Sequence, residues 1–254
     1  MHWLSISVCV LLHSLFLRNT FAASFSTMSN TIKLTYFDIE GVAESVRLAL
    51  LLSATPFEDV RVPFSEWPAM KPTTPNGQLP IMTIGGDDTN VKTQSKAMLR
   101  WVGMTKSNTL YPTDKVFEIE EMIGNLEDLQ RAFHPAHYMG MRPENFGYPE
   151  KFQSTEEGKK LIESMRTKFV KDELPKYIKC FTDKMEQHGG PFLVAGSEPT
   201  VADCAAVPVL RMLTCGFVDN VDPTCLDAYP TIVTYIKNFC ALEPVKGRYN
   251  SGIY

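Results

Sequence analysis

The sequence predicts a small α/β domain followed by a larger all-helical domain. Between residues 32 and 103, short apolar runs typical of strands alternate with segments in which apolar residues recur every three or four positions. From residue 115 onward the helical spacing persists and strand patterns are almost absent. The chain has 254 residues, of which 44% are hydrophobic and 21% charged, which is enough for two modest domains that each bury a core.

The first domain is predicted over residues 30–105, in the order strand, helix, strand, strand, strand, helix. The segment IKLTYF places Ile32, Leu34 and Tyr36 on one face of a strand. The other expected elements are a helix after Gly41 with apolar Ala43, Val46, Leu50 and Ala54, a strand over 57–64, a hairpin built from 79–86 and 89–94, and a helix over 95–104.

The second domain is predicted to be all-helical over residues 114–254, after a junction near 104–115. Its helices are expected at 116–133, 156–187, 200–213 and 230–242. Pro175 should bend the second of these, because proline lacks the N–H that an interior helix position needs. The segment TVADCAAVPVLRML is largely apolar, which predicts a buried helix.

Residues 1–24 form an expected signal or targeting segment. Residues 4–17 carry no charge, and this stretch is short for a membrane span but suited to the core of a signal peptide. If the leader is used, we expect entry into the secretory pathway, to the ER or to a plastid. A cut after Ser24 would leave Phe25 first, which resembles the bipartite plastid signals of algae with complex plastids. The alternative is translation from Met28, which would give a cytoplasmic protein. No membrane span is expected in the mature chain.

Charge and cysteine content exclude several function classes. The net charge of −4 argues against a nucleic-acid partner, because phosphate binding usually leaves a basic surface. Cys9 lies in the leader, and the other cysteines form no C-x-x-C pair and have no histidine cluster beside them. We therefore expect buried free thiols, with neither a disulfide framework nor a metal site.

Two short motifs lie at the ends of the predicted hairpin. Pro80 cannot donate to a strand ladder, so it should start the third strand. A trans Leu79–Pro80 bond would do no more than that, whereas a cis bond would present the Leu79 backbone to an extended peptide. Gln94 and Ser95 precede a helix, where Ser95 serves either as a structural N-cap or as part of an anion site at the helix N-terminus.

Three further features have alternative interpretations. Trp67 and Lys71 are four residues apart and form either a helix-surface pair or a donor and a positive charge for a peptide carboxylate. Thr200 and Asp203 have the spacing of a capping box with Asp in place of Glu or Gln, for which we expect a folding role. Taken alone, Tyr36 is more typical of a packing residue, because aromatic side chains are common in strands.

Together these motifs resemble the soluble glutathione transferases. KLTYFDIEGVAESVRL, SEWPAMK, NGQLPIM and TQSKAMLRW occur in the order and at the spacing of that family's thioredoxin-like N-terminal domain. EPTVADCAAV is similar to the capping motif of its helical C-terminal domain. The resemblance covers nearly all of residues 30–254. Leu-Thr-Tyr-Phe with the Trp and Lys of EWPAMK looks most like the sigma class, which includes glutathione-dependent prostaglandin D synthase.

The resemblance implies a role for each matching position. Tyr36 would be the catalytic hydroxyl. Trp67, Lys71 and Gln78 would contact the glycine carboxylate of glutathione, and Leu79, before a cis Pro80, would pair with the cysteinyl backbone. Gln94 and Ser95 would hold the γ-glutamyl end. Asp128, which stands beside Glu127, would reach the γ-glutamyl amine across a homodimer interface. The electrophile would lie in the second domain near Phe133, His137 and Tyr138. Glutathione would be a co-substrate, and no cofactor is implied.

The implied reaction is attack of the glutathione thiolate on small hydrophobic electrophiles. A free thiol has a pKa of about 8.5, and a phenol that donates a hydrogen bond to sulfur favours the anion. Sigma enzymes often have arginine where Val42 stands and lysine where Gln78 stands, so we expect weaker thiol activation or weaker glutathione binding. The alternatives are a glutathione-dependent isomerase or peroxidase on the same site, and a non-catalytic binding protein with the transferase fold.

Overall fold

A mixed four-stranded sheet organises the first domain in the computed structural model, which describes residues 31–249. Its strands are β1 (Ile32–Phe37), β2 (Phe57–Val62), β3 (Ile81–Ile84) and β4 (Lys92–Thr93), in the spatial order β2-β1-β3-β4. β1 and β2 are parallel, whereas β3 runs antiparallel to both β1 and β4. The predicted α/β domain and its hairpin are therefore confirmed. The predicted leader, residues 1–24, lies outside the described residues.

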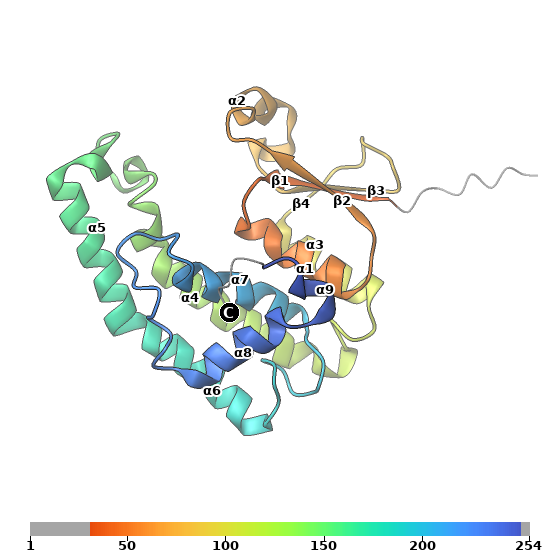
Figure 1. Ribbon diagram of the computed structural model, residues 1–254. Coiled ribbons are helices and arrows are strands. Elements are labelled where there is room, and N and C mark those ends of the chain that lie inside the picture. Colours follow the sequence, from red (N-terminus) through yellow and green to blue (C-terminus); the bar gives the residue numbers. More distant parts are fainter. Residues whose placement is uncertain (1–30, 250–254) are drawn as a thin grey trace, which may run out of the picture.

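The helices of this domain are α1 (Glu44–Leu52), α2 (Trp67–Met70) and α3 (Ser95–Lys106). α1 and α3 cover the face of the sheet that is turned toward the second domain, whereas α2 lies beyond the opposite face (Figure 1). The covered face is apolar because alternate β1 residues such as Leu34 point at α1, where Val46 and Leu50 are also fully buried.

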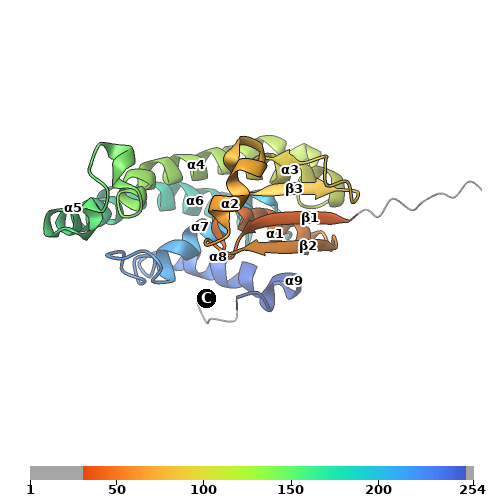
Figure 2. The ribbon, with the colours of Figure 1, turned by 90° about the horizontal axis from the view of Figure 1, so that it is seen from above.

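The described part of the second domain consists of helices joined by turns and loops. Its helices are α4 (Val116–Tyr138), α5 (Glu156–Lys168), α6 (Leu174–His188), α7 (Val201–Thr214), α8 (Pro230–Cys240) and α9 (Glu243–Lys246). Seen from above, α4 runs beside α3, to which it is joined by the ion pair of Arg100 with Glu120, and α5 extends away from the sheet (Figure 2). α6 lies at the end of the second domain that is remote from the sheet (Figure 1). None of the helices within residues 31–249 is long and apolar enough to cross a membrane.

Pro175 divides the single helix that periodicity predicts over 156–187. A π-helical turn, Phe169–Glu173, separates α5 from α6, and Pro175 is the second residue of α6. Proline cannot donate the N–H that would continue the α-helical ladder, and a local change to wider turns is one way for a helix to absorb this loss.

Several predicted boundaries are wrong by a few residues. The strand expected over 89–94 is reduced to Lys92–Thr93, because Asp87 accepts bonds from the N–H and the hydroxyl of Thr89 and extends the turn. β2 ends before Pro63, and α1 ends two residues before Ala54, whose φ is +49°. The five cysteines of the described chain are free, but only Cys204 and Cys240 are buried, and the other three are half-buried.

The two domains are joined by close packing and by backbone contacts. The N–H of Val201 donates to the carbonyl of Leu110 at 2.9 Å, which ties the start of α7 to the interdomain junction. A Cβ on Gly103 of α3 would lie 2.6 Å from Val201 Cγ1, so only glycine permits this approach. The capping box of Thr200 and Asp203 is present at the start of α7, as the sequence predicts.

Candidate functional site

Three motifs that are far apart in the sequence meet at one edge of the sheet. Thr35 pairs with Ile81 and Ile81 pairs with Thr93, both in antiparallel register. One residue further along each strand, the same register sets Tyr36, Pro80 and Gln94 in a row across β1, β3 and β4. The sheet thus brings the predicted catalytic hydroxyl, the Leu-Pro turn and the Gln-Ser helix entry to the same edge.

The Tyr36 side chain is enclosed by the loop that follows β1. It is 7% exposed, and a Cβ on Gly41 would lie 2.6 Å from its hydroxyl oxygen. Burial raises the pKa of Tyr36 above its ordinary value near 10, while a hydrogen bond from the Val42 backbone and the charge of Arg47 act in the opposite direction. The phenol is therefore protonated at neutral pH and can act as a hydrogen-bond donor.

The Leu79–Pro80 peptide bond is cis, which is the geometry that the resemblance implies. Pro80 is buried and directly precedes β3, whereas Leu79 is half-buried. The Leu79 backbone lies outside the paired residues of β3, at the sheet edge shared with Tyr36. An extended peptide can pair with backbone groups in this position.

Gln94 and Ser95 form the entry to α3, but their roles differ from the predicted ones. Gln94, not Ser95, occupies the N-cap position, with an unusual left-handed φ of +72°, and Ser95 is the first helical residue. The Gln94 carbonyl accepts bonds from Ala97 and Met98, and no side chain of the described chain caps this end. The first N–H groups of α3 are thus available to an anion, next to an outlier of the kind found at binding sites.

Trp67, Lys71 and Gln78 lie on the segment between β2 and β3. The Trp67 ring packs edge-on against Phe37, the residue after Tyr36, with centroids 5.3 Å apart. A Cβ on Gly77 would lie 3.4 Å from Lys71 Cε, so the lysine chain runs along the residue that precedes Gln78. Lys71 and Gln78 are exposed and come from neighbouring turns. The structure therefore places Trp67, Lys71 and Gln78, the three residues predicted to bind the glycine carboxylate, on one segment beside β1.

Asp128 lies on the exposed side of α4 and pairs with Arg131 of the same helix at 2.7 Å. Its neighbour Glu127 pairs instead with Lys96, in the first turn of α3, also at 2.7 Å. Within one described chain, Glu127 is thus the acid that lies beside the Gln94–Ser95 entry. The assignment of Asp128 across a dimer stays a prediction.

The three residues expected around the electrophile have different environments. Phe133 is 4% exposed and packs in the core against Phe169, with ring centroids 4.5 Å apart. Tyr138 lies close enough to Tyr36 to raise the pKa of the Tyr36 hydroxyl, after the larger effect of burial. Burial and the nearby charge of Arg166 lower the pKa of half-buried His137, which leaves it neutral at pH 7. Tyr138 is thus the member of the three that lies near Tyr36.

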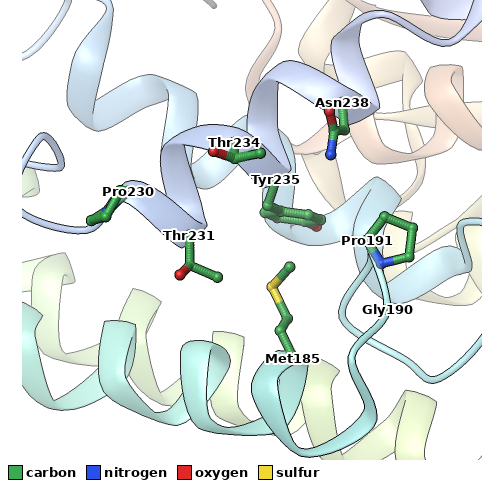
Figure 3. A pocket seen from close by; sticks show the side chains of 8 residues that line it. All are labelled: Met185, Gly190, Pro191, Pro230, Thr231, Thr234, Tyr235 and Asn238. Carbon is green, nitrogen blue, oxygen red and sulfur yellow. The ribbon is translucent and has the colours of Figure 1, made fainter.

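A separate shallow depression of about 380 Å³ lies between α6 and α8 (Figure 3). Its lining is Met185, Gly190, Pro191, Pro230, Thr231, Thr234, Tyr235 and Asn238. The hydroxyl of Tyr235 is already bonded to Asp203 at 3.0 Å, and the lining carries no charge. None of the predicted site residues lies there, so the depression is not part of the site at the sheet edge.

A buried polar cluster, which the sequence patterns above do not predict, lies beneath the Tyr36 loop. Glu44 and Arg47, on the otherwise apolar α1, are both 0% exposed, and their carboxylate and guanidinium groups lie 3.2 Å apart. Arg47 also pairs with Asp59 of β2 at 2.9 Å. A glutamate and an arginine three positions apart on a helix face that is otherwise apolar are the signal that could have revealed this cluster.

Comparisons with known proteins point to one family. The sequence profile described as "Glutathione S-transferase, C-terminal domain" matches residues 148–250. The class-mu 28 kDa glutathione S-transferase of Schistosoma bovis is 30% identical over 224 residues, which cover 87% of this chain and 94% of that protein. Glutathione S-transferase 1 of Ascaris suum is 46% identical over 71 residues, which cover 28% of this chain and 33% of that protein.

Solved structures show the same fold. A structure of prostaglandin synthase D from Nilaparvata lugens superposes with a TM-score of 0.68 at 23% identity, covering 85% of this chain and 96% of that one. The glutathione S-transferase of Ascaris lumbricoides gives a TM-score of 0.61 at 25% identity, covering 85% and 95%. The fold is that of a two-domain glutathione transferase, with a thioredoxin-like first domain and a helical second domain. The chain belongs to the glutathione S-transferase family and functions as a glutathione transferase.

Proposed function

We propose that this chain is a tyrosine-type transferase in which the Tyr36 hydroxyl donates a hydrogen bond to the glutathione sulfur. The observation that supports this most strongly is the register that places Tyr36, Pro80 and Gln94 in a row at one sheet edge. A protonated phenol beside a peptide-binding turn can stabilise a thiolate. Each unit by which the thiol pKa falls is worth about 1.4 kcal/mol and increases the thiolate fraction up to tenfold.

The other predicted residues hold the peptide in this proposal. Lys71, Trp67 and Gln78 bind the glycine carboxylate through a charge and two kinds of N–H donor. The Leu79 backbone pairs with the cysteinyl residue. The γ-glutamyl carboxylate binds the open N-terminus of α3 at Gln94 and Ser95.

The quaternary structure and the class are part of the same proposal. Asp128 binds the γ-glutamyl amine of the glutathione that is held by a second copy of the chain, which makes the functional unit a homodimer. The sigma class is supported by the Leu-Thr-Tyr-Phe segment with Trp67 and Lys71, although several relatives carry the class-mu name. Val42 leaves a 51% exposed apolar side chain where sigma enzymes often place a cation, so thiol activation depends more on the phenol alone.

Tyr36→Phe tests the proposal directly. Conjugation of a general electrophile should fall at least about tenfold, while glutathione binding measured by calorimetry changes less than about twofold. Tyr177→Phe, a change of the same size on α6, should leave both quantities at the wild-type level. Unchanged conjugation by Tyr36→Phe would show that the phenol does not activate the thiol.

The same thiolate could serve an isomerase or a peroxidase, so the assay should also include a lipid endoperoxide and a hydroperoxide. Turnover of only one of these substrates would assign the narrower activity. Retention on immobilised glutathione without any turnover would instead support a binding protein.

A further inference from the structure

Arg248 and Tyr249, which follow α9, lie against α1. The carboxylate of fully buried Glu44 accepts two hydrogen bonds from Arg248, of which the Nη2–Oε2 bond is 2.6 Å long. The Tyr249 hydroxyl donates to the same carboxylate at 2.9 Å. A bidentate, buried contact of this kind fixes geometry better than a single exposed ion pair. The second domain thus reaches back to the start of α1.

Glu44 is connected to the loop around the Tyr36 phenol through Arg47. The Arg47 Nη1 atom donates to Glu44 at 3.2 Å, to the Ile39 carbonyl at 2.9 Å and to the Glu40 carbonyl at 3.2 Å. The next two residues of that loop contact the phenol through the close approach of Gly41 and the Val42 backbone. Contacts therefore run without interruption from Arg248 to the Tyr36 hydroxyl.

The same loop is supported from its other side by α7. The Glu40 carboxylate pairs with Arg211 at 3.4 Å, and the Arg211 guanidinium stacks on the Tyr249 ring, 3.8 Å from its centroid. We name the group formed by Glu40, Glu44, Arg47, Arg211, Arg248 and Tyr249 the C-terminal clasp. Its members come from the Tyr36 loop, α1, α7 and the segment after α9, so the loop is held by both domains.

The charges of the clasp explain why Arg248 matters. The Arg47 guanidinium donates hydrogen bonds to the carboxylates of Glu44 and Asp59 and to the backbone carbonyls of residues 39 and 40. If Arg248 is removed, the buried Glu44 carboxylate has Arg47 as its nearest remaining cation, which draws the guanidinium toward Glu44 and away from the loop. A buried carboxylate that loses one partner acts strongly on the partners that remain, because the interior screens charge poorly.

We propose that Arg248 is a positioning residue for catalysis, which acts through Glu44 and Arg47 to hold the 39–43 loop and the Tyr36 hydroxyl at the glutathione sulfur. The proposal rests on the proposed role of Tyr36 as the donor to that sulfur. Arg248 itself touches neither glutathione nor the reacting atoms. The pKa of the bound thiol should therefore depend on Arg248, while glutathione affinity should depend on it much less.

The test is a pH titration of the thiolate of bound glutathione, followed by its ultraviolet absorbance, with the full chain and five variants. Arg248→Ala should raise the pKa of the bound thiol by about one unit, a loss of up to tenfold in thiolate, with the glutathione dissociation constant within about twofold of wild type. Arg248→Lys, which keeps the charge but not the bidentate contact, should shift it less. Tyr249→Phe removes one bond to Glu44 and replaces Arg248→Ala if that variant fails to fold.

Two controls make the outcomes distinct. Phe181→Leu opens a cavity at a fully buried position of α6 and lowers stability without touching the clasp. An equal thiol shift in Phe181→Leu, or a wild-type thiol pKa in Arg248→Ala and Tyr249→Phe, would overturn the proposal. Tyr36→Phe in the same titration reports on the proposed function separately: if it leaves the thiol pKa unchanged, the donor role fails whatever the Arg248 variants do.

Discussion

Gly41→Ala should damage catalysis more than stability. An added Cβ would lie 2.6 Å from the Tyr36 hydroxyl oxygen and 2.8 Å from Cε1, where ordinary contacts begin at 3.4 Å. The phenol or the loop must therefore move by about 0.8 Å, the difference between 3.4 and 2.6 Å. A misplacement near 1 Å can cost about 100-fold in rate, so we expect kcat/KM to fall by about 10- to 100-fold. Residue 41 also has a φ of +47°, which adds about 1–2 kcal/mol of backbone strain for alanine.

Gly189→Ala separates the steric effect from the backbone strain. Gly189, at the end of α6, has a similar φ of +65°, but a Cβ added there would meet nothing within 4 Å. Both variants should lose similar stability in urea unfolding, while only Gly41→Ala loses conjugation of a general electrophile. Wild-type kcat/KM in Gly41→Ala would refute the claim that this loop sets the position of the Tyr36 hydroxyl.

Three further predictions concern stability and affinity. Burial raises the pKa of Glu44, but the bonds from Arg248 outweigh this effect and leave the folded-state pKa below the ordinary value of 4.5. The ionised carboxylate therefore stabilises the fold above pH 4.5. This contribution is lost as the pH falls through the lower folded-state pKa. Urea unfolding between pH 3 and 7, roughly the range over which carboxylates titrate, should show this loss in the wild type and a smaller one in Arg248→Ala. Lys71→Met should weaken glutathione binding by about two- to fivefold in calorimetry, since an exposed charge contributes little, and kcat should stay near wild type. Gly158→Ala would place a Cβ 2.0 Å from the Phe152 carbonyl oxygen, and should destabilise the chain by about 3 kcal/mol with unchanged glutathione affinity. A wild-type melting temperature for Gly158→Ala would contradict this packing.

Local residue patterns predict correctly the strands and helices that have a clear apolar periodicity. The alternation in IKLTYF predicted β1, and the apolar run after Thr200 predicted a buried α7 with its capping box. Short elements were predicted less well. β4 is shortened by side-chain bonds within the turn before it, and the helix at Pro175 is divided by a π-helical turn. In both places local hydrogen bonding decides the backbone conformation, and the apolar periodicity alone does not indicate it.

The spacing of Glu44 and Arg47 on α1 could have indicated a buried polar pair, but its connection to Arg248 and Tyr249 was not predictable from local patterns, because these partners are far apart in sequence. Arg248 lies 204 positions after Glu44, and neither residue belongs to a motif that points to the other. The convergence of Tyr36, Pro80 and Gln94 was implied by resemblance, but the physical reason for it is strand register, which the sequence alone does not specify.

A crystal structure of the chain with bound glutathione tests the central claim most directly. The quantity to measure is the distance from the Tyr36 hydroxyl oxygen to the glutathione sulfur. We predict a value within about 3.5 Å, the range of a hydrogen bond to sulfur, with the cysteinyl backbone paired to Leu79 and the γ-glutamyl carboxylate at Gln94 and Ser95. A sulfur beyond hydrogen-bond reach of Tyr36, with the peptide bound in this same groove, would contradict the account.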